Sequence, residues 1–178
     1  MRAARIEIDD PQALLLYRQR LMRLKAKHEA WKLGNAVIRD KSLNRDKRVA
    51  KLRGAGMQHE EARDFIRRGG AEPKVIQGLI TQIRQVELKI EFLESVRYQA
   101  YAERELAPGI TEYFDPQVMR FGVMFDGATP PEHAAHLARR GYRFSPTADR
   151  WQRKITPSYK KAIRALREYF RRASDEEK

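Results

Sequence analysis

Residues 141–156 constrain the fold most, because these sixteen residues combine a helix end, two short strands, a turn and a helix start. Glycine readily adopts the left-handed conformation that ends a helix, so Gly141 predicts a helix C-terminus. Tyr142 and Phe144 fall on one side of the first strand, since successive side chains alternate between the faces of a strand. Thr156 precedes a proline, a pair typical of a helix N-terminus. The segment therefore predicts a hairpin with one apolar and one cationic face.

The surrounding chain predicts a small α+β module over residues 108–173. Strands are expected at residues 110–114 and 119–125, where apolar and polar side chains alternate in the second strand. Thr129 and Glu132 have the spacing of a capping box and predict the start of a helix. A last helix buries the stripe Tyr159, Ile163, Leu166 and Phe170. The order is β-β-α-β-β-α, an antiparallel sheet with helices on one face.

Residues 1–107 predict a helical region with two long and two short helices, and residues 174–178 an acidic tail. The first long helix carries an apolar seam at Leu14, Tyr17, Leu21, Leu24, His28, Trp31, Asn35 and Ile38, and the second a heptad seam at Ile76, Leu79, Ile83, Val86, Ile90 and Leu93. Pairing the two seams predicts an antiparallel hairpin within the chain; the alternative is a homodimer through the heptad helix, residues 73–96. The short helices, near residues 44–54 and 59–68, fit a packed helical hairpin or a helix-turn-helix.

Charge and composition narrow the class of partner. The net charge is +13, and residues 150–172 hold nine lysines and arginines against the single acidic Glu168. Such a cluster favours nucleic acid as partner, although a basic surface on an arginine-rich soluble protein is the alternative. The absence of cysteine excludes disulfides, thiolate nucleophiles and cysteine-ligated zinc. The start of the chain lacks the apolar core of a signal peptide, and no apolar run approaches the roughly 20 residues of a membrane span, so we expect a cytoplasmic protein.

Few residues indicate catalysis or a cofactor. His133 and His136 have a spacing that can chelate a metal, but the capping box already uses the neighbouring Glu132, and surface histidines are the simpler interpretation. Nucleotide-binding loops, nucleophile elbows and zinc-protease motifs are absent from the sequence. We therefore expect no enzyme, metal or cofactor. The alternative of a divergent metal-dependent nuclease would rely on Asp126 or Glu112.

Two rows of cations make polyanion binding the better-supported chemistry. One row follows the last helix at spacings of four, three and four, and the other occupies the sheet face away from the helices, where arginine suits phosphate because its guanidinium contacts two oxygens. The alternative is that these cations are solvated or paired with acids. Tyr142, Phe144 and Trp151 fit a sheet core better than a base-stacking surface. The predicted nucleic-acid-binding residues are Arg120, Arg143, Arg150, Gln152, Lys154, Lys160, Arg164, Arg167 and Arg171.

The C-terminal half resembles a module of phage and plasmid proteins. The matching runs are Phe121-Gly-Val-Met-Phe-Asp-Gly127, Pro130 to Gly141, Tyr142-Arg-Phe-Ser-Pro146 and Arg150-Trp-Gln-Arg153 through Thr156. The module occurs in uncharacterised, antirestriction-associated and large polyvalent proteins, and the match covers about 40 residues. Phe144 stands where the family often has tryptophan, and residues 147–149 lack the usual glycine or asparagine. The resemblance implies a mobile-element origin and assigns no catalytic residue.

These observations lead to a functional expectation. A non-enzymatic phage or plasmid protein of this charge is expected to bind nucleic acid, or a protein–nucleic acid complex, and so to inhibit a host defence system of the CRISPR or restriction type. Many such inhibitors are acidic mimics of DNA, whereas this chain has the opposite charge. The alternative is a sequence-tolerant DNA- or RNA-binding accessory protein without a defence target.

Overall fold

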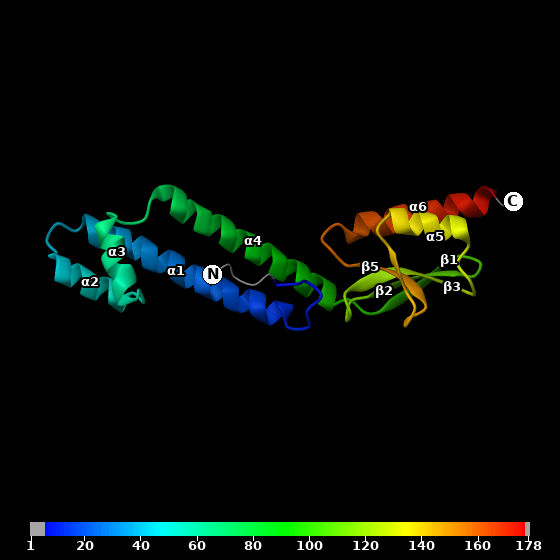
Figure 1. Ribbon diagram of the computed structural model, residues 1–178, viewed down its shortest axis with the longest axis horizontal. Helices are drawn as coiled ribbons and strands as arrows, with labels where there is room; N and C mark the ends of the chain where they lie inside the picture. The colour runs from blue at the N-terminus through cyan, green and yellow to red at the C-terminus, as the bar shows by residue number, and fades with distance from the viewer. Residues whose placement is uncertain (1–5, 177–178) are drawn as a thin grey trace. The chain divides into compact units, whose positions relative to one another are not determined.

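The computed structural model describes residues 6–176 (Figure 1). These residues form an α+β protein with helices α1–α6 and a five-stranded antiparallel sheet, which confirms the predicted fold class. They divide into two compact units, one of residues 14–91 and one that joins residues up to 13 with residues from 92 onward.

The unit of residues 14–91 contains the predicted helical hairpin. The hairpin consists of α1 (Ala13–Arg39) and α4 (Pro73–Arg97), and most of both helices lies in this unit. Every predicted seam position on these two helices is buried or half-buried. Between the helices, Lys25 Nζ lies 2.8 Å from Glu87 Oε1, and the Lys89 ammonium lies 5.3 Å from the centre of the Tyr17 ring. The two helices therefore contact each other within the chain, through side chains beside the heptad seam of α4.

The two short helices pack as a pair. They are α2 (Arg45–Gly54) and α3 (His59–Arg67), and the Asn44 side chain caps α2 by accepting a 2.9 Å hydrogen bond from the Lys47 amide. Leu52 and Phe65 are buried in a cluster that also contains Val37 of α1. The packing agrees with the interpretation as a helical hairpin.

The second unit holds a sheet with one strand more than predicted. Its strands are β1 (Ala102–Ala107), β2 (Ile110–Asp115), β3 (Arg120–Phe125), β4 (Arg143–Ser145) and β5 (Arg150–Lys154), in the order β1-β2-β3-β5-β4. The strand missing from the prediction is β1, which lies in the segment expected to be helical. Residues 108–109 form the turn between β1 and β2, with Gly109 at φ 74°, instead of separating a helical region from the sheet.

Helices α5 (Pro131–Arg139) and α6 (Tyr159–Glu176) cover one face of this sheet (Figure 1). Phe121, Leu137 and Phe170 are almost completely buried in the core that results. Gly141, at φ 81°, ends α5 as predicted. The prediction of a capping box at Thr129 and Glu132 is wrong, because no side chain caps the N-terminus of α5. The Thr129 hydroxyl instead accepts a hydrogen bond from the Trp151 indole.

Candidate nucleic-acid interface

The register of the sheet tests the predicted cationic face. Residues paired across antiparallel strands share a face. Arg120 is paired with Lys154, Arg143 with Gln152, and Arg150 with Ser145. Since Phe121 lies on the helix-covered face against Tyr159 of α6, Arg120 and its alternating neighbours lie on the other face. The five predicted sheet residues therefore do share the face away from the helices.

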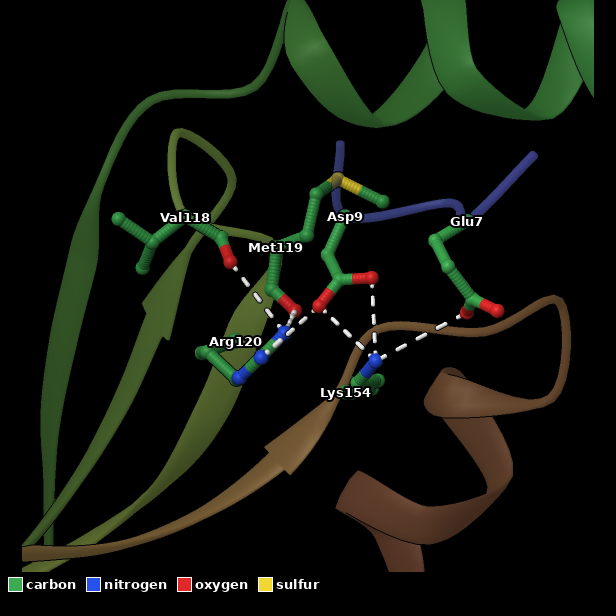
Figure 2. A network of polar contacts seen from close by, with 6 residues as sticks. All are labelled: Glu7, Asp9, Val118, Met119, Arg120 and Lys154. Carbon is green, nitrogen blue, oxygen red and sulfur yellow. Dashed lines mark hydrogen bonds and ion pairs between the residues drawn. The ribbon is translucent and has the colours of Figure 1, made fainter. Parts of the chain in front are cut away.

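An acidic N-terminal segment, residues 6–12, neutralises part of this face. Asp9 Oδ2 lies 3.0 Å from Arg120 Nη2 and 2.9 Å from Lys154 Nζ, and Glu7 lies 4.0 Å from the same lysine (Figure 2). Burial alone would raise the pKa of Asp9, but the hydrogen bonds from Lys154 and Arg120 outweigh it and hold that pKa below its ordinary value. Both cations are thus occupied by carboxylates of the chain itself.

Arg150 is also held by the sheet. Its guanidinium carbon lies 4.2 Å from the centre of the Tyr113 ring, and Nη2 lies 3.9 Å from Asp115. Burial raises the pKa of Tyr113 to about 12, although the nearby Arg150 charge opposes the shift. Gln152 is half-buried. Of the five predicted sheet residues, only Arg143 is both exposed and without an ion pair to another described residue.

On α6, one predicted residue has a structural role. The Arg167 guanidinium donates hydrogen bonds of 2.8 and 2.6 Å to the two carboxylate oxygens of Glu112, which is only 4% exposed. These hydrogen bonds raise the pKa of Arg167, and the arginine compensates the buried charge of Glu112. Arg167 is therefore committed to the fold. Glu112, one of the two residues of the nuclease alternative, has both carboxylate oxygens hydrogen-bonded to this arginine.

Like Arg167, the other three predicted α6 residues are exposed. Arg171 lies 3.8 Å from Asp175, an exposed pair one turn apart that contributes little to stability. Lys160 and Arg164 form no ion pair with any described residue. These two are the strongest part of the predicted interface.

Three further cations of the layer formed by α5 and α6 were not predicted from the sequence. Arg139 ends α5, Arg140 directly follows it, and Lys161 follows Lys160 on α6; all three are exposed and unpaired within residues 6–176. We call Arg139, Arg140, Lys160, Lys161 and Arg164 the helix-layer cations.

The predicted aromatic core is partly confirmed. Tyr142 is buried, and Trp151 is half-buried and hydrogen-bonded to Thr129. Phe144 is the exception, because it is 44% exposed with its ring centre 5.7 Å from that of Trp151.

The two histidines flank a tyrosine instead of sharing an open site. His133 is buried with Nδ1 2.8 Å from the Tyr169 hydroxyl, and His136 stacks on the Tyr169 ring at 3.5 Å. Burial lowers the pKa of His136, and the positive charges of Arg140 and Arg139 lower it further. Within residues 6–176, no group of three or more histidines and acids is arranged to hold a metal ion.

None of the helices in the described part of the chain has the length and apolar character needed to cross a membrane. No family model, no curated protein and no solved structure matches the chain.

Proposed function

We propose that this chain is a non-enzymatic protein that binds nucleic acid through the helix-layer cations. The proposal depends on one observation: all five cations are exposed, lie in α5, directly after it or in α6, and have no acidic partner among the described residues. Lysine and arginine without local partners are available to replace the counterions of a phosphate backbone. The cations of the sheet face, by contrast, are largely paired with Asp9, Glu7 and Asp115.

Binding of this kind should depend steeply on salt and little on sequence. Phosphate contacts position a backbone without reading bases, and each one releases counterions. We expect the double variant Lys160→Gln/Arg164→Gln to lower the slope of log affinity against log salt by roughly 1.5, about 0.7 to 0.9 for each of the two cations removed. Fluorescence anisotropy with labelled single- and double-stranded DNA and RNA measures this slope.

Arg171→Gln/Arg172→Gln is a matched control, because it removes the same charge from the far end of the same helix. Equal effects of the two double variants would show that net charge matters and position does not. Failure of the wild type to bind any of these nucleic acids at low salt would refute the proposal.

We further propose that the physiological target is a host defence nuclease that carries nucleic acid, of the CRISPR or restriction type, in the cytoplasm of the host cell. The support is the resemblance of residues 121–156 to a module of phage and plasmid proteins together with the basic surface. The competing function is an accessory protein that binds free DNA or RNA. A defence inhibitor should bind a guide-loaded or DNA-bound nuclease more tightly than naked nucleic acid and block its cleavage, whereas an accessory protein should show no such preference.

A further inference from the structure

A hollow between α5, β5 and the beginning of α6 is lined by four basic side chains. It has a volume of about 190 Å³, and its polar lining consists of His136, Arg140, Tyr142, Arg153, Ser158 and Lys161. Among the residues that the structure describes, no aspartate or glutamate lines it. A water molecule occupies about 30 Å³ in the liquid, so the hollow has room for a group the size of a phosphate. Its chemistry favours an anion.

Arg153 is the least expected member of this lining. It is paired with Phe121 across the sheet and therefore lies on the helix-covered face, among apolar side chains. Its Nη1 donates a 2.8 Å hydrogen bond to the Arg140 carbonyl, and its guanidinium lies 5.9 Å from the centre of the Tyr142 ring. These contacts fix the guanidinium in place and leave further N–H donors for a ligand, because the group has five.

Tyr142 supplies an independent observation. Its side chain is 4% exposed, and its buried hydroxyl has no hydrogen-bond partner among the described residues. A buried hydroxyl without a partner is unusual, since most buried polar atoms are hydrogen-bonded. The hydroxyl itself is closed to solvent, so a ligand with acceptor oxygens in the adjoining hollow would give it a partner after a small local rearrangement.

The N-terminal end of α6 adds to the positive potential in the hollow. Ser158 directly precedes Tyr159, the first residue of the helix, so the positive end of the helix dipole adjoins the hollow. The amides of Tyr159, Lys161 and Ala162 donate to the carbonyls of Thr156 and Ser158, so this end would act on an oxyanion chiefly through its dipole.

We propose that this hollow is a phosphate-binding site that holds a phosphoryl group between Arg140, Arg153 and Lys161. The inference deepens the proposed function: the phosphoryl group would be the terminal phosphate of a bound strand or a free small phosphate. Arg153 would orient the group, and Lys161 would close the open side.

The first probe is inorganic phosphate, and NMR spectroscopy of the full chain detects its binding. We expect saturable shifts at Lys161 and at the His136 ring, and roughly tenfold weaker binding in Lys161→Gln, the loss typical of a charged hydrogen bond. Arg172→Gln is the charge-matched control, about 16 Å further along α6 at 1.5 Å per residue. The proposal is refuted if phosphate causes no saturable shift, or if both variants weaken binding equally. Lys161 is exposed, so its substitution leaves the fold intact, whereas Arg153→Gln also removes the contact with Arg140 and serves as a second variant.

Two oligonucleotides of one sequence, one with a 5′-phosphate and one with a 5′-hydroxyl, distinguish the two possible sources of the phosphoryl group. Tighter binding of the phosphorylated strand, abolished in Lys161→Gln, identifies a strand end as the ligand. Equal binding of both strands, with inorganic phosphate still bound, identifies a free phosphate. Binding of the hydroxyl strand by the Lys160→Gln/Arg164→Gln variant tests the proposed function separately, because Lys160 and Arg164 are helix-layer cations that do not line the hollow.

Discussion

Arg167 shows how a single residue can be assigned to the wrong role. In the sequence it continues the cationic row of α6, but in the structure it holds the buried carboxylate of Glu112, 55 residues away in the chain. The difference matters for experiments, since a charge reversal at Arg167 would destabilise the protein whatever the protein binds. Variants of the interface should therefore be confined to exposed, unpaired cations such as Lys160 and Arg164.

The Arg167→Gln variant should lower the free energy of unfolding by about 2–3 kcal/mol, because it leaves the Glu112 charge buried without compensation. Arg164→Gln, on the same helix, should change it by no more than about 0.5 kcal/mol. Urea unfolding followed by circular dichroism measures both values. Equal stabilities of the two variants would contradict the structural role of Arg167.

The Tyr142→Phe variant should raise the stability of the protein in phosphate-free buffer by about 1 kcal/mol, because it removes a buried hydroxyl that has no partner among the described residues. Tyr98→Phe is the matched control, since Tyr98 is 86% exposed and its hydroxyl is solvated. Thermal unfolding measures the difference. A loss of stability on Tyr142→Phe would mean that the hydroxyl has a partner in the folded protein.

Among the elements, the acidic N-terminal segment has a role that its sequence does not indicate. The carboxylate of Asp9 contacts cations of β3 and β5, which lie more than a hundred residues away in sequence. It occupies positions on the sheet that a phosphate would otherwise take. This contact makes the stability of the sheet unit depend on pH.

The folded-state pKa of Asp9 lies below the unfolded value, so its contribution to stability is present above about pH 4 and is lost as the pH falls through the folded value. We therefore expect Asp9→Asn to destabilise the protein at pH 6 and to have little effect near pH 2. Denaturant unfolding at the two pH values measures this difference. If Asp9→Asn destabilised the protein equally at both pH values, the contribution of Asp9 would not be electrostatic.

Periodic elements were predictable from the sequence, and one irregular strand was not. The seams of α1 and α4, the alternation in β3 and the helix stop at Gly141 follow from local spacing, and the structure has all of them. The sequence of β1, Ala-Glu-Arg-Glu-Leu-Ala, consists of good helix formers without alternation. It forms a strand because it pairs with β2 at the edge of the sheet, a tertiary effect that overrides local preference.

The interface was only partly predictable for a related reason. Alternation correctly placed Arg120, Arg150 and Lys154 on one face, but their acidic partners come from the N-terminal segment or from β2, which is not adjacent to β5 in the sheet. Arg153 did carry a local signal, because it occupies an inward-facing position between Trp151 and Ile155. A cation at such a position marks either a buried pair or a binding site.

Across the sheet unit, the distribution of charge is more informative than the total. The cations of the open sheet face are mostly paired, whereas the helix-layer cations and the basic lining of the hollow have no acidic partner among the described residues. The net charge of +13 alone would allow any basic surface to bind nucleic acid, including the basic helix α1. Within the sheet unit, the pairing pattern favours the layer formed by α5 and α6 over the open sheet face.

The most direct test of this account is an NMR footprint of a short single-stranded oligonucleotide on the full chain, recorded at low salt. We expect the largest shifts at residues 139–140 and 160–164, with small shifts at Arg120, Lys154 and α1. Shifts concentrated on the open sheet face or on α1 would contradict the assignment of the interface to the helix-layer cations.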